Sequence, residues 1–175
     1  METEPKDVIV LGSIRRGKKK FSNIQDETKI SSEELNLILE DLENKKLIEV
    51  EEKKGWFGKK IELKITDEGS NELDRKIIEI QDKWKQMQAI YESGDKQKLQ
   101  QKMEENKSFL PSMMFFGIMD MMMFSMMFSM MGIGMSDYIS QENMADAGMD
   151  DGSTDNGSMD NGSMDNGGFD FDIGF

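Results

Sequence analysis

The sequence predicts an α+β fold, in which three helices and a two-stranded β-hairpin within residues 1–66 are followed by a long helix over 67–107. Two observations carry this prediction. Apolar residues recur at a spacing of three and four within 8–14, within 35–42 and through 73–91, which is typical of helices with one buried face. Between those stretches, two short segments alternate apolar and charged residues, which is typical of half-buried strands.

The first two predicted helices are short. The first begins near Asp7, whose carboxylate can cap it, and runs to about Arg16, where Gly17 ends it; its apolar residues are Val8, Leu11 and Ile14. The second carries Ile24, and Ser22 can cap it. A basic run, RRGKKK, connects the two helices.

The third predicted helix has the clearest pattern. Ser31 or Ser32 can cap it, and Glu33 and Glu34 follow in the first turn, where acidic side chains suit the helix dipole. Its apolar face consists of Leu35, Ile38, Leu39 and Leu42.

Two strands follow the third helix. The segments LIEVEEK (47–53) and IELKIT (61–66) alternate apolar and charged residues, and KGWFGK lies between them. Gly55 and Gly58 allow a hairpin in that connection, and Asp67 can cap the next helix.

This order of elements, over about residues 7–76, resembles the winged helix-turn-helix of MarR-, PadR- and ArsR-type transcription regulators. The tract SSEELNLILEDLENKKLIEV, the hairpin and KITDEGSNEL carry the resemblance, and LKITDEG is similar to the T-x-x-G entry into the following helix. The resemblance implies that double-stranded DNA is the partner. The third helix would enter the major groove, and the hairpin, called the wing, would contact the DNA backbone or minor groove.

The expected DNA contacts come from three places. On the third helix they are Ser32 and Asn36, because asparagine can recognise adenine. On the wing they are Lys53, Lys54, Trp56, Lys59 and Lys60, where lysines neutralise phosphates and the aromatic residue stacks or wedges. In the basic run they are Arg15, Arg16, Lys18, Lys19 and Lys20.

Two features of this region favour other interpretations. The wing aromatics, Trp56 and Phe57, could simply close the hairpin while the lysines are solvated. The outward face of the third helix also carries Glu33, Glu40 and Glu43, which repel phosphates. The alternative function is therefore that of an adaptor, whose winged helix and methionine-rich segment both bind protein. This alternative includes an adaptor that associates with a membrane.

The long helix, with a break expected at Gly94, carries an apolar seam that steps by four and three residues. The seam consists of Leu73, Ile77, Ile80, Trp84, Met87 and Tyr91. Such a seam packs either against a second copy or against the helix's own domain. We expect a homodimer, because PadR-like regulators use a C-terminal helix in this way.

Residues 108–135 form a methionine-rich segment, and 109–135 contain eleven of the 18 methionines. Three interpretations are open: an adaptable surface for an apolar protein partner, a membrane segment, and a Cu(I) site made of thioethers. We rank them in this order. Asp120 lies near the middle of the segment, where a charge opposes membrane insertion.

The last segment, 136–175, is rich in Gly, Ser, Asn and Asp, repeats DNGSM, and is expected to be disordered. All 22 Lys and Arg lie between Lys6 and Lys107, whereas the eleven acids from Asp120 onward have no base among them. We expect this acidic tail to modulate DNA binding. Its end, FDFDIGF, resembles the acidic, Phe-ended tips of bacterial single-stranded-DNA-binding proteins.

The composition also bears on chemistry and location. The chain has neither Cys nor His, which excludes thiolate and imidazole catalysis and zinc fingers. No nucleophile–base constellation or phosphate-binding glycine loop is recognisable, so we expect neither an enzyme nor a cofactor. The start, METEPKDVIV, lacks the apolar core of a signal peptide, and we expect a cytoplasmic protein that could associate with a membrane.

Overall fold

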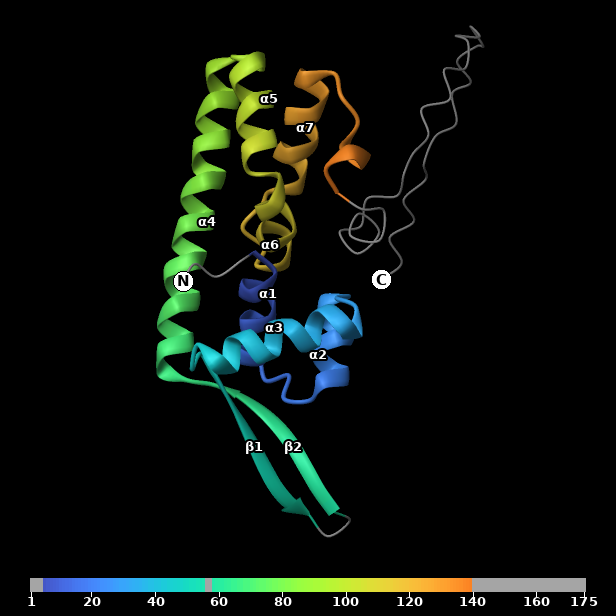
Figure 1. The fold of residues 1–175 in the computed structure, drawn as a ribbon. Coiled ribbons are helices and arrows are strands. Elements are labelled where there is room, and N and C mark those ends of the chain that lie inside the picture. Colours follow the sequence, from blue (N-terminus) through green and yellow to red (C-terminus); the bar gives the residue numbers. More distant parts are fainter. Residues whose placement is uncertain (1–4, 56–57, 140–175) are drawn as a thin grey trace, which may run out of the picture.

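The computed structural model describes residues 5–55 and 58–139, and it confirms the α+β winged helix-turn-helix. The winged-helix half contains α1 (Pro5–Arg15), α2 (Phe21–Thr28), α3 (Ser32–Asn44), β1 (Ile48–Gly55) and β2 (Gly58–Ile65). The second half contains α4 (Asp67–Ser93), α5 (Lys96–Glu105), the 3₁₀ turn η1 (Lys107–Phe109), α6 (Leu110–Phe115), α7 (Met121–Met131) and the 3₁₀ turn η2 (Met135–Asp137). Helix α4 runs along both halves (Figure 1).

The starts of the helices differ from the prediction in three places. Asp7 is not a cap but lies in the first turn of α1, buried, with its carboxylate 3.9 Å from the Lys45 ammonium. Ser22 is not a cap either, because α2 begins one residue earlier, after Lys20. Helix α4 is capped by Thr66, whose hydroxyl oxygen accepts from the Gly69 N–H at 2.9 Å, so Asp67 is its first residue. The observed N-caps of α2 and α4, Lys20 and Thr66, lie two residues and one residue before the predicted ones.

The hairpin is antiparallel, with Ile48 opposite Ile65 and Gly55 opposite Gly58. Only its base is half-buried as predicted: Ile48 and Leu63 lie in the core, whereas Ile61 is 59% exposed. The reason is visible in Figure 1, where the outer part of the wing projects away from the helices and has no core to face. Residues Trp56 and Phe57, predicted at its tip, lie outside the described residues.

The predicted break at Gly94 is confirmed. Gly94 adopts a left-handed backbone conformation (φ 74°) that ends α4, and the Asp95 carboxylate then caps α5 by accepting from the Lys98 N–H at 3.0 Å. Helix α5 turns back beside α4, and the two helices run antiparallel (Figure 1).

The seam on α4 is used inside its own chain. Leu73, Ile80, Trp84 and Met87 are buried, and the remaining two seam residues, Ile77 and Tyr91, pack against the same core. Helices α1, α5 and α6 contact α4 along this side. The side chains predicted to form a homodimer contact through the seam thus pack against helices of the same chain.

The methionine-rich segment is largely core. Pro111 lies in the first turn of α6, Gly117 (φ 65°) follows the end of this helix, and the Asp120 carboxylate caps α7 by accepting from the Met123 N–H at 2.9 Å. Several of its side chains are fully or almost fully buried: Met113, Met119, Phe124, Met127, Phe128 and Met131. In the described part of the chain, no helix combines the length and apolar character needed to cross a bilayer.

One hydrophobic cluster runs from Val8 in α1 to Ile139 after η2. It contains residues from both the predicted 67–107 helical segment and the predicted 108–135 segment, so these two segments pack as one helical unit. The winged helix meets this unit closely at Gly12, where a Cβ atom would lie 2.6 Å from the Phe116 ring. The predicted acidic tail lies beyond the described residues, except for 136–139.

Candidate nucleic-acid interface

Helix α3 lies across the winged-helix half with one face in the core and one face in solvent. Leu35, Ile38 and Leu42 are buried. The face predicted to be outward is exposed: Ser32, Glu33, Asn36, Glu40 and Glu43. This orientation is the one that a recognition helix requires.

Local contacts fix the start of α3. The Ser31 hydroxyl caps the helix by accepting from the Glu34 N–H at 3.3 Å, which decides between the two predicted caps. The Gln25 side chain donates to the Ser32 hydroxyl at 2.7 Å and thereby joins α2 to α3. Lys6 forms an ion pair with Glu34 from the α1 side. The N-terminal end of α3 is thus held by both preceding helices.

Leu37 is a residue of this face that the sequence analysis missed. It is 67% exposed in the middle of α3, beside Asn36 and one turn from Glu33 and Glu40. A helical projection would have placed it there, because it lies off the face defined by Leu35, Leu39 and Leu42. An exposed leucine amid polar residues can contact a thymine methyl group or an apolar partner side chain.

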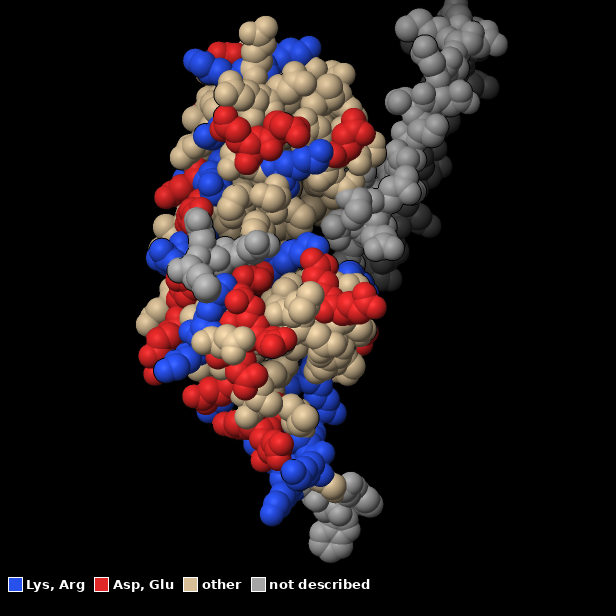
Figure 2. Space-filling model, viewed as in Figure 1, with Lys and Arg blue, Asp and Glu red and all other residues tan. Residues whose placement is uncertain are grey.

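The charge on this surface is divided. Figure 2 shows acidic side chains interleaved with uncharged ones over the lower half, where α3 crosses the molecule, and lysines gathered toward the end of the hairpin. The exposed face of α3 has three acids and no base between residues 32 and 43. Attraction for a polyanion on this side of the molecule is therefore concentrated in the wing.

The wing lysines are arranged in facing pairs. Lys53 lies opposite Lys60, and Lys54 lies opposite Lys59. Glutamates compensate part of this charge. The Glu62 carboxylate is 2.8 Å from the Lys53 ammonium and 3.3 Å from that of Lys60.

These ion pairs change the titration of the wing. The hydrogen bond from Lys53, with a further one from Lys60, lowers the pKa of Glu62, and the same carboxylate raises the pKa of Lys53. Both groups thus remain charged over a wide range around neutral pH. The described strands hold five lysines and four glutamates, a net charge of +1, so phosphates would compete with Glu62 and its neighbours for these ammonium groups.

The arginines and the lysines of the basic run, residues 15–20 at the end of α1, make different contacts. Arg15 forms an ion pair with Asp74 of α4. Arg16 donates to the Phe115 carbonyl at 2.8 Å, stacks 4.2 Å from the centre of the Phe115 ring, and lies 3.5 Å from the Glu27 carboxylate. The guanidinium groups of these two residues, predicted to contact DNA, therefore link the winged helix to α4 and α6.

The three lysines of the run lie nearer the wing. The Leu63 N–H of β2 donates to the Lys19 carbonyl at 2.8 Å, which holds this segment against the hairpin. Lys19 and Lys20 are exposed, and Lys18 is half-buried. The structure thus brings the lysine run and the wing lysines onto neighbouring segments, whereas the exposed side chains of Arg15 and Arg16 contact Asp74 and Phe115.

Within residues 5–55 and 58–139, no group of three or more His, Cys, Asp or Glu side chains is arranged to hold a metal ion.

A family model described as HxlR-like helix-turn-helix matches residues 5–93, just over half of the chain, and this range includes α1 through α4. Comparisons with curated proteins and with solved structures gave no significant match.

Proposed function

The chain belongs to the HxlR-like helix-turn-helix family of DNA-binding transcription regulators, and from this premise we propose that it binds double-stranded DNA through the N-terminal half of α3 and the wing. The single observation that carries the proposal is the outward face of α3, which is exposed and is held at its start by α1 and α2. The family is regulatory rather than enzymatic.

Helix α3 would dock by its N-terminal end. Backbone N–H groups and the positive end of the helix dipole favour phosphate at this end, and they offset part of the repulsion from Glu33 and Glu34 in the first turn. Ser32 and Asn36 lie in the first two turns. Glu40 and Glu43 lie in the last two turns, where a tilted helix keeps them away from the phosphates. Asn36 would recognise adenine, and Leu37 would contact a thymine methyl group.

The wing would supply most of the nonspecific attraction. Lys53, Lys54, Lys59 and Lys60, together with Lys19 and Lys20 beside β2, would contact phosphates, and Trp56 is the proposed aromatic contact at the tip. Each lysine that leaves its glutamate for a phosphate releases a counterion from the DNA. DNA binding should therefore weaken steeply as salt increases.

The full chain is expected to bind duplex DNA with an affinity that falls on a log–log plot against salt concentration. A slope of about −4 corresponds to four to five neutralised phosphates at about −0.9 for each. Fluorescence anisotropy with a labelled library of genomic fragments, from 20 to 300 mM salt, measures this slope. A chain that shows no anisotropy change at the lowest salt concentration would contradict the proposal.

One observation favours a second candidate function, in which the winged helix binds protein. An exposed leucine framed by Glu33, Asn36 and Glu40 is a suitable contact for a partner with an apolar pocket and a basic rim. Replacing Leu37 with Ala distinguishes the two functions. If the protein binds DNA, the substitution changes the affinity mainly for DNA sites that have thymine at the contacted position. If the protein is an adaptor, the substitution abolishes binding of the protein partner.

We also propose that the protein is a homodimer, through a surface on α7 rather than the buried seam. Met122 is 70% and Met126 is 47% exposed, one turn apart on α7, and Met130 follows after another turn. No charged residue occurs from Met121 to Ser136. An uncharged apolar stripe of this kind, with Met122 and Met126 exposed and Met130 partly buried in one chain, is favourable to cover with a second copy.

Replacing Met126 with Glu is expected to weaken the dimer at least ten-fold, because it would place a carboxylate in the centre of the covered stripe. Sedimentation velocity of the full chain at several concentrations measures the effect. The matched control is Ile78→Glu, which introduces the same charge at an exposed apolar residue of α4, 58% exposed, and should leave the dimer intact. If the unsubstituted chain sediments as a monomer at 100 μM, the α7 dimer is wrong.

The acidic tail is proposed to compete with DNA for the wing lysines. Residues 150–175 contain seven aspartates and no base. Deleting them should tighten DNA binding several-fold, most strongly at low salt, where charges are least screened. A full-length variant with these aspartates changed to Asn serves as the charge control and should bind as tightly as the truncated chain. Equal affinities of all three proteins at 20 mM salt would exclude the competition.

A further inference from the structure

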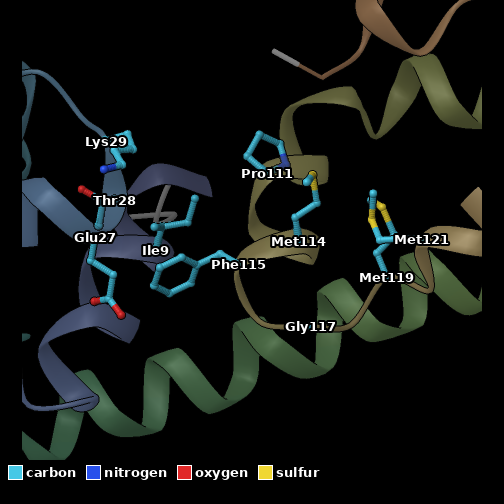
Figure 3. Close-up of a pocket in the computed structure, with 10 residues that line it drawn as sticks. All are labelled: Ile9, Glu27, Thr28, Lys29, Pro111, Met114, Phe115, Gly117, Met119 and Met121. Carbon is cyan, nitrogen blue, oxygen red and sulfur yellow. The ribbon is translucent and has the colours of Figure 1, made fainter. Parts of the chain in front are cut away.

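A cavity lies where the winged helix meets the methionine-rich helices. Its volume is about 310 Å³, and its walls come from both halves of the molecule. The winged-helix wall consists of Ile9, Glu27, Thr28 and Lys29, and the opposite wall consists of Pro111, Met114, Phe115, Gly117, Met119 and Met121 (Figure 3). This size is at the lower end of the range for small-molecule sites.

The wall formed by α6, the start of α7 and the residues between them is apolar and polarisable. Met114, Met119 and Met121 contribute three thioethers, and Phe115 contributes a ring. Thioether sulfur contacts aromatic rings favourably, and flexible methionines adapt to the outline of a planar ligand. This wall is therefore suited to an aromatic ring system.

The winged-helix wall is polar, and its charges are not equivalent. The Glu27 carboxylate is already neutralised, because it accepts from the Ser13 hydroxyl and lies 3.5 Å from the Arg16 guanidinium. The Lys29 ammonium, in contrast, has no carboxylate partner among residues 5–55 and 58–139. Thr28 lies beside it and has a hydroxyl that can donate. The electrostatics of this wall thus favour an anion at Lys29.

We propose that this cavity binds a small aromatic carboxylate. The ring lies between the thioethers and Phe115, and the carboxylate accepts hydrogen bonds from the Lys29 ammonium and the Thr28 hydroxyl. An uncharged aromatic compound of the same shape would lose the ion pair and bind less tightly. An aliphatic carboxylate of two or three carbons would lose the contacts with the apolar wall.

The position of the cavity gives this ligand a route to the recognition helix. Lys29 is the left-handed residue (φ 56°) that ends α2, and two residues later Ser31 caps α3. A neighbouring cavity of about 230 Å³ shares Ile9, Thr28, Lys29 and Pro111 as walls and reaches Ser31 and Glu34. A ligand that joins Lys29 to α6 therefore holds the α2–α3 turn against the methionine-rich helices. Its effect on DNA rests on the proposed function, whereas its binding does not.

Isothermal titration of the full chain tests binding without DNA. The probes are 1-naphthoate, its neutral amide 1-naphthamide, and acetate. We expect 1-naphthoate to bind the unsubstituted chain, 1-naphthamide to bind at least ten-fold more weakly, and acetate not to bind at millimolar concentration. Lys29→Gln should weaken 1-naphthoate at least ten-fold and leave 1-naphthamide unchanged. The control Lys85→Gln removes an equivalent exposed charge from α4 and should change neither.

Two results would contradict the proposed binding site. One is the absence of a heat of binding when 1-naphthoate is titrated to 5 mM, and the other is an equal affinity of the unsubstituted and Lys29→Gln proteins for 1-naphthoate. A second measurement adds saturating 1-naphthoate to the DNA-binding assay. Weaker DNA binding by the unsubstituted chain, and no change for Lys29→Gln, would connect the cavity to α3. Binding of 1-naphthoate by a chain that binds no DNA would keep the site and refute the proposed function.

Discussion

Changing Lys53, Lys54, Lys59 and Lys60 to glutamate is expected to abolish DNA binding. Each substitution changes the charge by two units, so the described wing strands would go from a net charge of +1 to −7. Counterion release, which supplies most of the nonspecific affinity, would be replaced by repulsion. Fluorescence anisotropy should show no binding at salt concentrations where the unsubstituted chain is saturated.

A matched pair of double variants controls for net charge. Lys54→Glu with Lys59→Glu changes the facing pair nearest the end of the wing, and Lys85→Glu with Lys98→Glu makes the same charge change on α4 and α5. The wing pair should lower affinity at least ten-fold and reduce the salt slope by about 2, since two phosphate contacts are lost. Equal losses from the two pairs would show that the wing does not contact DNA.

Phe124→Ala is expected to destabilise the protein by about 3–5 kcal/mol, the usual cost of removing a large aromatic side chain from a core. Phe124 is fully buried in α7, with its ring centre 6.4 Å from that of Trp84 and 4.8 Å from that of Phe128. The loss would leave a cavity between α4 and α7. Urea denaturation followed by circular dichroism measures the free energy of unfolding.

Met122→Ala is the control on the same helix. Met122 is 70% exposed in one chain, so its truncation should change the free energy of unfolding by less than about 0.5 kcal/mol at concentrations where the protein is monomeric. If Phe124→Ala prevents folding altogether, Phe124→Leu should still fold and cost a smaller amount. A Phe124→Ala protein as stable as the unsubstituted chain would mean that α7 does not belong to the core.

The winged-helix half could be predicted because its local signals agree with one another. The face made by Leu35, Ile38 and Leu42 and the capping serine both indicate α3, and glycines mark the ends of the two strands. The caps were harder to place, because Thr66 and Asp67 are adjacent and either side chain can accept from the first turn. Long-range packing decides between such neighbours: the Thr66 hydroxyl also donates to the Lys46 carbonyl at 2.8 Å.

The second half could be predicted only in part. The seam around Ile80 and Trp84 has the same spacing whether a second chain or the chain's own helices cover it, so the pattern cannot choose between them. Methionine is equally ambiguous, because it fills cores as readily as it coats binding surfaces. Asp120, interpreted as an obstacle to membrane insertion, is the cap of α7.

At the candidate site, too, local patterns predict the exposure of side chains but not their distant partners. The exposure of Asn36 and its neighbours on α3 follows from helix periodicity and was predictable. The ion pair of Arg15 with Asp74 joins residues far apart in the sequence, and no local pattern signals it. Lys29 was missed for a related reason. It lines a cavity whose opposite wall contains Met114 and Met119, about 85–90 residues away in the sequence, and no local pattern signals such a cavity.

The close approach at Gly12 has a consequence for how this chain can change in evolution. A Cβ atom there would meet the Phe116 ring at 2.6 Å, and Phe116 belongs to a segment beyond the residues that the family model matches. The two positions are therefore expected to vary together: a larger residue at position 12 should occur only with a smaller one at 116. Relatives whose chains lack helices equivalent to α6 and α7 have no ring at this place, so residues larger than glycine should be common at the position equivalent to 12.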